Sequence, residues 1–314
     1  MSRFFLLAGS FLGWGLGAND SANIFGTAVY TKVVSYRLAV ILTSIFVVLG
    51  AIIDGDKGIN KVSSFASLNG IEDIHVAFMV MLAAAITVFF MTLLKLPVST
   101  SQAVVGAILG HGILLSKGDL GVTSQFFGAW VLTPVGGMIF SLLLYGITVK
   151  WIEKRFVSFK YFENLIKGGY IIAGVFAAYS LGANNVANVF GVFMVDSTYL
   201  SLEYARLLGG LSIAFGVVTY SKPVMMTVGK GIVPLTSITG FLVIIASAIT
   251  VYIYAQIGIP VSTSQAVVGA IIGIGLVKDY RLINVKMLTR IFGGWLLTPT
   301  IAGLVSFIFL KIFL

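Results

Sequence analysis

Long runs of apolar residues alternate with short polar segments along this chain of 314 residues. Three such runs are LAVILTSIFVVLGAII (38–53), IHVAFMVMLAAAITVFFMTLL (74–94) and FLVIIASAITVYIYAQIGI (241–259). Each approaches or reaches the roughly 20 residues that a helix needs to cross the hydrocarbon core of a bilayer. Because lipid offers no hydrogen-bond partners to the backbone, segments of this kind form helices. The pattern therefore predicts an all-α polytopic membrane protein.

Three motifs occur twice, in the same order and at nearly constant spacing, so the chain consists of two homologous halves. We expect a first repeat at 1–149, an interfacial linker at 150–167, with the character of an amphipathic helix, and a second repeat at 168–314. Each half reads as a helix broken at its first motif, a spanning helix, a re-entrant hairpin tipped by its second motif, and a last span. The motifs are GAND (17–20) and GANN (182–185), PVSTSQAVVGAILG (97–110) and PVSTSQAVVGAIIG (260–273), and FGAWVLTP (127–134) and FGGWLLTP (292–299).

The two repeats are expected to have opposite orientations across the membrane. A hairpin returns to its starting side, so each half makes an odd number of net crossings and the second half lies upside down. Thirteen lysines and arginines then fall on one side and six on the other, with Lys95 left uncounted. Positive residues gather in cytoplasmic loops, which puts both termini outside the cell membrane. Inverted repeats with broken helices are typical of secondary transporters, whose substrate sites lie near the midplane.

The first motif places polar side chains inside an apolar segment. Asp20 is the one acid of eleven that falls within a predicted span, and an ionisable group at that depth costs several kcal/mol unless it is paired. Either its neighbours satisfy it structurally, or it binds a cation or carries a proton. Hard oxygen ligands suit sodium, which favours a Na+ site formed by Asn19, Asp20 and Asn23. The second copy offers the amide oxygens of Asn184, Asn185 and Asn188 without the charge, and we expect it to bind a cation less tightly.

The second motif, PVSTSQ, predicts an anion site. Pro97 and Pro260 disfavour helix in the residue before them, and an apolar helix follows each tip, near Gln102 and Gln265. A helix N-terminus presents free N–H groups and partial positive charge to an anion. One hydroxyl would suffice as an N-cap, whereas three in a row occur in both halves. The expected phosphate ligands are Ser99, Thr100, Ser101, Gln102, Ser262, Thr263, Ser264, Gln265 and Asp20.

A tetrahedral oxyanion has oxygens to share between two hairpin tips that face each other. Sodium bound first at the asparagine clusters would make the surroundings of Asp20 attractive to it, which couples the two solutes. Lys95 precedes the first tip and could touch the anion or extend to the membrane interface. His75 and His111 are interpreted as helix-end residues. The segments DKGIN (56–60) and VGKGI (228–232) lack the full spacing of a phosphate-binding loop.

Composition narrows the alternatives further. The chain is 58% hydrophobic and 10% charged, with a mean hydropathy of +1.05, whereas soluble domains carry about 25% charged residues. The net charge of +9 is explained by topology, so the lipid bilayer and not nucleic acid is the expected partner. There are no cysteines, which excludes disulfides and thiolate metal sites. No histidine or second acid shares the membrane interior with the serines, so we expect neither an enzyme nor a cofactor, only Na+, or H+, as a co-transported ion.

The doubled GAN[DN]-x-AN and PVSTSQ motifs resemble those of the inorganic phosphate transporter family, which includes sodium- and proton-coupled permeases. The resemblance covers essentially the whole chain. It implies an inverted-repeat fold with two re-entrant hairpins, a homodimer, an elevator-like motion, and sodium/phosphate symport at the residues named above. Many members carry aspartate in both motif copies, whereas position 185 is asparagine here, which bears on the number and identity of the coupled ions.

Three alternative functions are compatible with the sequence. The family also contains sulfate permeases, although a carboxylate at Asp20 favours protonated phosphate, which can donate a hydrogen bond that sulfate lacks. A proton-coupled permease for phosphate or a metal–phosphate complex would use Asp20 as its proton carrier. A channel is a third possibility, since paired re-entrant hairpins also build channels.

Overall fold

The computed structural model describes residues 2–93, 98–152, 159–228, 233 and 235–313, and within these residues the chain is helical with no strand. The first half contains α1 (Leu6–Tyr30), α2 (Tyr36–Asp54), α3 (Asp56–Leu68), α4 (Ile74–Leu93), α5 (Thr100–Leu114) and α6 (Leu120–Ile152). The second half contains α7 (Phe159–Phe190), α8 (Leu202–Val228), α9 (Ser237–Ile257), α10 (Thr263–Lys278) and α11 (Val285–Phe313). Short 3-10 helices lie at Ser2–Phe5, Gly191–Val195 and Tyr280–Leu282.

Among the described residues, seven helices are long and apolar enough to cross a membrane: α2, α4, α6, α7, α8, α9 and α11. The helices α5 and α10 are equally apolar in character but shorter, at 15 and 16 residues. The prediction of an all-α, multi-pass membrane protein is therefore confirmed. The helix α1 is less apolar than these seven, because its sequence is interrupted by Asn19, Asp20 and Asn23.

Local sequence signals set the helix boundaries. The helix α2 begins after Ser35, whose hydroxyl accepts a hydrogen bond from Leu38 N, as an N-cap serine does. The helix α9 begins at a capping box in which Thr236 and Thr239 bond reciprocally. It ends at Gly258, whose φ of +82° lies in the left-handed region that glycine adopts without strain. These caps fix where α2 begins and where α9 begins and ends.

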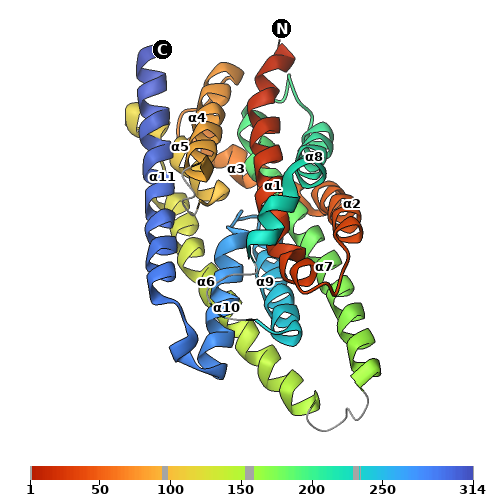
Figure 1. Ribbon diagram of the computed structural model, residues 1–314. Helices are drawn as coiled ribbons and strands as arrows, with labels where there is room; N and C mark the ends of the chain where they lie inside the picture. Colours follow the sequence, from red (N-terminus) through yellow and green to blue (C-terminus); the bar gives the residue numbers. More distant parts are fainter. Residues whose placement is uncertain (1, 94–97, 153–158, 229–232, 234, 314) are drawn as a thin grey trace.

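The two apolar hairpins approach the centre of the molecule from opposite ends. In Figure 1 the α4–α5 pair lies in the upper half of the view and the α9–α10 pair in the lower half. Both chain ends, marked N and C, lie at the top. Ser99 and Ser262, which directly precede α5 and α10, are both buried.

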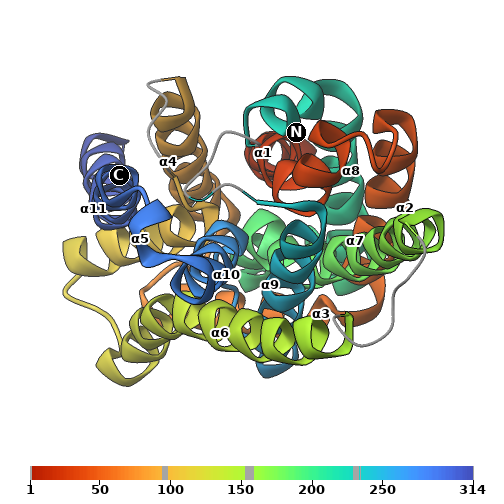
Figure 2. The ribbon, with the colours of Figure 1, turned by 60° about the horizontal axis from the view of Figure 1, so that its bottom comes forward.

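The short helices of each half pack mainly against long helices of the other half. The helix α5 contacts α11 extensively, and α10 contacts α6 in the same way (Figure 2). Likewise α1 packs along α8, and α2 packs along α7. Neither half is therefore a separate globular body, since each buries its apolar surface against the other.

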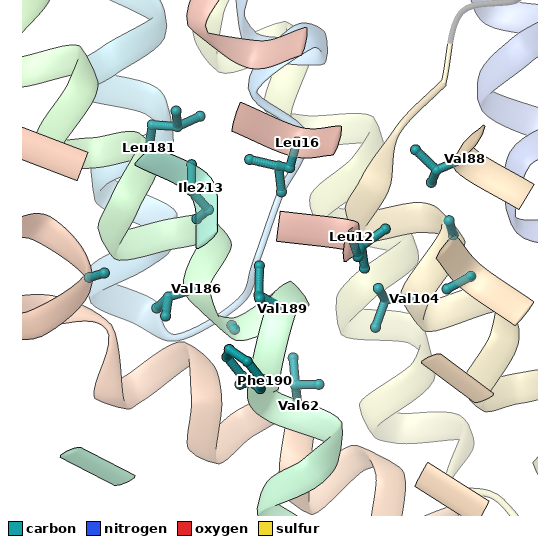
Figure 3. Packing of buried hydrophobic residues seen from close by; sticks show 14 of the residues in the cluster. Leu12, Leu16, Val62, Val88, Val104, Leu181, Val186, Val189, Phe190 and Ile213 are labelled. Atoms are coloured by element: carbon teal, nitrogen blue, oxygen red, sulfur yellow. The ribbon is translucent and has the colours of Figure 1, made fainter. Parts of the chain in front are cut away.

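Small residues allow several of these helices to touch backbone to backbone. A Cβ at Gly17 of α1 would overlap the carbonyl oxygen of Ile213 in α8, and a Cβ at Gly182 of α7 would overlap that of Val47 in α2. Close approach of this kind is how membrane helices gain packing energy. Around these contacts, Leu12, Leu16, Val186, Val189, Phe190 and Ile213 form part of a continuous buried core (Figure 3).

The expected break in the two motif helices is wrong. The helices α1 and α7 run through Gly17 and Gly182 without a break; the motif glycines permit close packing instead of interrupting the helix. Residues 56–60 form the start of α3, a short helix that the expected order of elements does not contain, and its Ile59, Val62 and Phe65 are buried at helical spacing. Of the expected linker, 150–152 end α6 and 159–167 begin α7, while 153–158 lie outside the described residues.

Candidate functional site

The second polar motif contacts the tip of the second hairpin directly. The side chain of Asn184 in α7 donates from Nδ2 to the carbonyl oxygen of Val261 at 2.8 Å, and its Oδ1 accepts from Val261 N at 3.0 Å. Val261 lies in the non-helical segment between α9 and α10, where backbone groups have no helical partner. Asn184 is 1% exposed. One amide therefore satisfies both backbone groups of a buried tip residue.

Asn185 and Asn188 extend this contact into a chain of buried amides. Asn185 Nδ2 donates to Thr263 Oγ1 and to the carbonyl oxygen of Leu181, each at 3.2 Å. Asn188 Nδ2 donates to Asn185 Oδ1 at 3.1 Å. The oxygen of Asn188 is buried and accepts no hydrogen bond in the described structure. A buried amide oxygen without a donor is suited to a cation, because it otherwise costs about 1–3 kcal/mol.

The serines of the two tips have the same geometry in both hairpins. Ser99 and Ser262 are the N-caps of α5 and α10, each accepting from the backbone N–H three residues on at 3.4 Å. Each also lies within hydrogen-bonding distance of the serine two residues later, at 3.2 Å for Ser101 and 2.9 Å for Ser264. One hydroxyl per tip thus caps the helix. The helices begin at Thr100 and Thr263, two residues earlier than the sequence indicates.

The first polar motif is arranged less tightly than the second. Asn23 Nδ2 donates to Asp20 Oδ1 at 3.4 Å, and Asn19, Asp20 and Asn23 are all half-buried. The helix α1 also contacts α10, and α7 contacts α5. Each helix that carries a GAN motif therefore contacts the helix that follows the hairpin tip of the other half. It also packs against helices of its own half.

The glutamines that follow the tips face a large apolar cavity. Gln102 and Gln265 are 3% and 1% exposed, and their Oε1 atoms have no hydrogen-bond partner among the described residues. The cavity has a volume of about 960 Å³ and lies among α5, α6, α10 and α11. None of the serine, threonine, asparagine or aspartate candidates at the tips and motifs lines it, so it is separate from the polar cluster. Its walls include Gln102, Gln265, Trp130, Trp295, Pro134 and Pro299.

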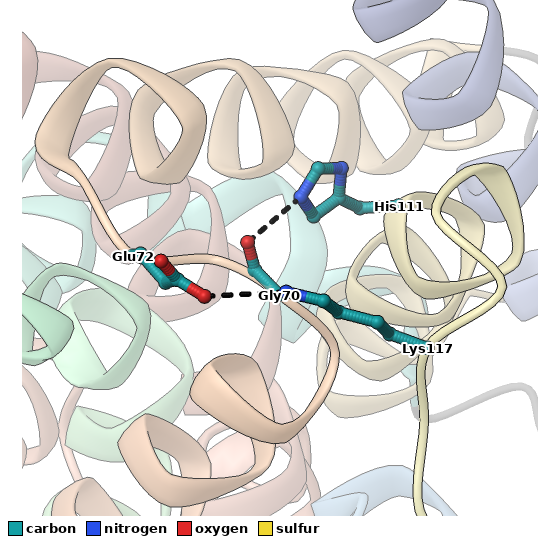
Figure 4. Close-up of polar contacts among 4 residues, drawn as sticks. All are labelled: Gly70, Glu72, His111 and Lys117. Carbon is teal, nitrogen blue, oxygen red and sulfur yellow. Dashed lines mark hydrogen bonds and ion pairs between the residues drawn. The ribbon is translucent and has the colours of Figure 1, made fainter.

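The remaining candidates lie at the ends of helices. His111 is at the end of α5, with Nε2 3.2 Å from the carbonyl oxygen of Gly70 (Figure 4). Beside it Lys117 forms an ion pair with Glu72 at 3.3 Å, and both side chains are largely exposed. These contacts agree with the interpretation of His111 as a helix-end residue. Lys95 and Pro97 lie outside the described residues.

One polar cluster was not anticipated from the sequence. Tyr179 in α7 and Tyr252 in α9 both donate to Asp54 Oδ2, at 2.6 and 3.2 Å. Nearby Lys57 Nζ donates to Gln256 Oε1 at 2.6 Å. These bonds connect the α2–α3 corner to the second half over more than 120 positions of sequence. No local motif identifies such a pair, because both tyrosines stand in otherwise apolar helices.

Comparison with known proteins gives consistent results. The family model described as the phosphate transporter family matches residues 16–163 and 153–306. A Pyrococcus horikoshii protein named "Putative phosphate permease" is 27% identical over 396 aligned positions, covering 98% of this chain and 97% of its own length. The sulfate permease CysP of Bacillus subtilis is 28% identical, covering 98% of this chain and 87% of its own.

A solved structure supports the same relationship in three dimensions. The structure titled "The sodium-dependent phosphate transporter" superposes with a TM-score of 0.87 at 25% sequence identity, covering 100% of this chain and 99% of that one. The helical architecture described above is thus that of a transporter. With family matches over both halves, the chain belongs to the phosphate transporter family.

Proposed function

We propose that this protein is a secondary active transporter that imports inorganic phosphate by symport with sodium, using alternating access to a central site. The observation that carries the proposal is the buried contact between the GANN motif of α7 and the hydroxyl tip of the second hairpin, at 2.8–3.2 Å. It joins candidate cation ligands to candidate anion donors in one polar cluster. The printed names of the related permeases and of the solved transporter agree with both solutes.

The phosphate would lie between the two hairpin tips. Its oxygens would accept hydrogen bonds from the N-terminal amides of α5 and α10 and from Ser99, Thr100, Ser101, Ser262, Thr263 and Ser264. Neutral hydroxyls and amides bind an oxyanion without fixed positive charge, so the ion can still leave. Gln102 and Gln265, which follow the tips, brace them or bond to the anion. Asp20 accepts a hydrogen bond from protonated phosphate.

Sodium would bind at the two amide clusters. Asn19, Asp20 and Asn23 supply a carboxylate and two amide oxygens, whereas Asn185 and Asn188 supply amide oxygens alone. The unpartnered Oδ1 of Asn188 supports a cation at the second cluster. Asn184 belongs to the same cluster, but both of its polar side-chain atoms already bind Val261. The charge of Asp20 makes the first cluster the tighter of the two for a cation.

The inverted repeat would supply the two-sided access that such a transporter needs. Three observations support it: the hairpins approach from opposite ends, the contacts between the halves occur in matching pairs, with α5–α11 matching α10–α6 and α1–α8 matching α7–α2, and the family model matches once over each half. We assign 1–149 and 168–314 as the repeats and 150–167 as their connection. The protein would act in the plasma membrane, as a homodimer, with both termini outside.

Sulfate is the second candidate substrate, because a sulfate permease is 28% identical over 98% of this chain. The two anions differ in that phosphate retains a proton near neutral pH and sulfate does not. If Asp20 selects between them, it accepts that proton in a hydrogen bond and repels sulfate. Unlabelled sulfate at tenfold excess would then leave phosphate uptake unchanged.

Uptake of radiolabelled phosphate into proteoliposomes tests the proposal. With an inward sodium gradient we expect accumulation above equilibrium, and with choline in place of sodium we expect only equilibration. Asp20→Asn should lose most of the gradient-driven accumulation. Undiminished accumulation in choline that follows an inward proton gradient would instead establish proton coupling, and flux that ignores both gradients would establish a channel.

A further inference from the structure

The two GAN motifs are nearly identical in sequence but unequal in their contacts. Asn184 is 1% exposed and forms two hydrogen bonds with Val261. Asn19, its counterpart in the first motif, is half-buried, and no hydrogen bond joins it to Val98 in the part of the chain that the structure describes. The same difference separates Asn185, bonded to Thr263, from its counterpart Asp20.

We propose that Asn184 is a positioning residue, which holds the tip of the second hairpin against α7 through both polar atoms of its side chain. We call this pair of hydrogen bonds between Asn184 and Val261 the amide latch. The inference deepens the function proposed above, on which its relevance to transport rests. It moves Asn184 from the set of cation ligands to the set of residues that place Ser262 and Thr263.

The geometry of the amide latch accounts for this role. A primary amide carries one donor and one acceptor side by side, and so does a residue whose backbone N–H and carbonyl oxygen face the same direction. Pairing the two leaves neither backbone group of Val261 unsatisfied. Such groups must find partners inside a membrane protein, because lipid supplies none. The tip can therefore be buried only while Asn184 is in place.

Because of the position of Val261, the amide latch also positions the side chains that are candidates for binding phosphate. Val261 directly precedes Ser262, the N-cap of α10, and Thr263, the first residue of that helix. A shift of Val261 away from α7 would move both hydroxyls and separate Thr263 from Asn185. The amide latch thus sets the distance between the candidate phosphate donors and the candidate cation ligands.

A cation ligand and a positioning residue respond in opposite ways to Asn184→Asp. If Asn184 bound sodium, the added carboxylate would raise sodium affinity. As a positioning residue, aspartate loses the donor to Val261 and turns a carboxylate oxygen toward the carbonyl oxygen of that residue. We therefore expect no gain in sodium affinity, together with a raised KM for phosphate. A gain in sodium affinity with an unchanged KM would overturn the proposal.

A labelling experiment measures the amide latch without relying on transport. The chain has no cysteine, so Val261→Cys introduces a single thiol at a site that is 0% exposed. The change leaves the backbone groups of position 261 intact. We expect the thiol in the purified full-length protein to react slowly with a water-soluble maleimide. Adding Asn184→Ala should speed the reaction roughly tenfold or more, since two buried hydrogen bonds are lost.

The matched control is Asn19→Ala in the same Val261→Cys background, which removes the corresponding amide of the first motif and should leave the labelling rate unchanged. Equal rates with and without Asn184→Ala would reject the amide latch. If that variant does not elute as a folded species, Asn184→Asp, which keeps the size of the side chain, takes its place with the same expected increase. Because labelling needs neither phosphate nor sodium, failure of the proposed transport function and failure of the amide latch give different results.

Discussion

Replacing Gly17 by alanine tests whether the GAN motif depends on direct contact between the backbones of α1 and α8. A methyl group at position 17 would lie 2.8 Å from the carbonyl carbon and 3.1 Å from the Cα of Ile213, with the carbonyl oxygen closer still. Ordinary contacts begin at 3.4 Å, so the carbonyl carbon must recede by about 0.6 Å and the oxygen by more. Backbone cannot rotate aside as a side chain can, so the helices must separate.

Overpacking of this kind costs about 1–3 kcal/mol. Alanine also favours helix over glycine by about 1 kcal/mol, and this gain must be subtracted. Gly15→Ala supplies the correction, because Gly15 lies on the same helix with nothing within 4 Å of a new Cβ. Both variants gain the same helix propensity from alanine. The difference between their stabilities therefore measures the effect of the contact with α8 alone.

Thermal unfolding in detergent, followed by tryptophan fluorescence at one scan rate, provides the comparison. We expect Gly17→Ala to unfold several degrees below Gly15→Ala. Phosphate uptake should fall in the same variant, because the displaced part of α1 carries Asn19, Asp20 and Asn23. Equal midpoints for the two variants would refute the close contact and with it our explanation of the motif glycines.

Three further predictions concern single side chains. Tyr179→Phe removes the 2.6 Å hydrogen bond to Asp54 and should lower the free energy of unfolding by about 1.5–3 kcal/mol, measured by denaturation in mixed micelles; no change would mean that the carboxylate finds another donor. Lys117→Ala breaks an exposed ion pair with Glu72 and should cost less than about 1 kcal/mol in the same assay, whereas a larger loss would show that the pair is not screened by solvent. Asn185→Asp adds a carboxylate to the second cluster and should raise sodium affinity, read from the sodium dependence of phosphate uptake; an unchanged half-saturation would argue against a cation there.

Much of the architecture follows from local sequence. Apolar length identifies the long helices, and Pro260 marks the tip between α9 and α10. The serines at positions 99 and 262 were expected at helix starts, and both are N-caps. These features depend on neighbouring residues and on the thickness of a bilayer, so a single sequence is enough to predict them.

The expectation that failed, and the contacts that could not be predicted, concern residues whose neighbours lie in distant parts of the chain. Because glycine lowers helix propensity, the sequence predicts a helix break at Gly17, but the neighbour of this residue is the backbone of Ile213 in α8. The motif predicts a cation ligand at Asn184, and this stays a prediction; the sequence does not indicate that its hydrogen-bond partner is the backbone of Val261, 77 positions away. Spacing along the chain cannot show which backbone group a side chain will face. The role of each site residue remains a prediction.

A density map of the protein with bound phosphate and sodium tests the central claim most directly. We predict a tetrahedral density that lies within hydrogen-bonding distance of hydroxyls from both tips, Ser99–Ser101 and Ser262–Ser264. We also predict a cation at the carboxylate of Asp20. Phosphate bound by residues of one hairpin alone, or density far from both tips, would contradict the account.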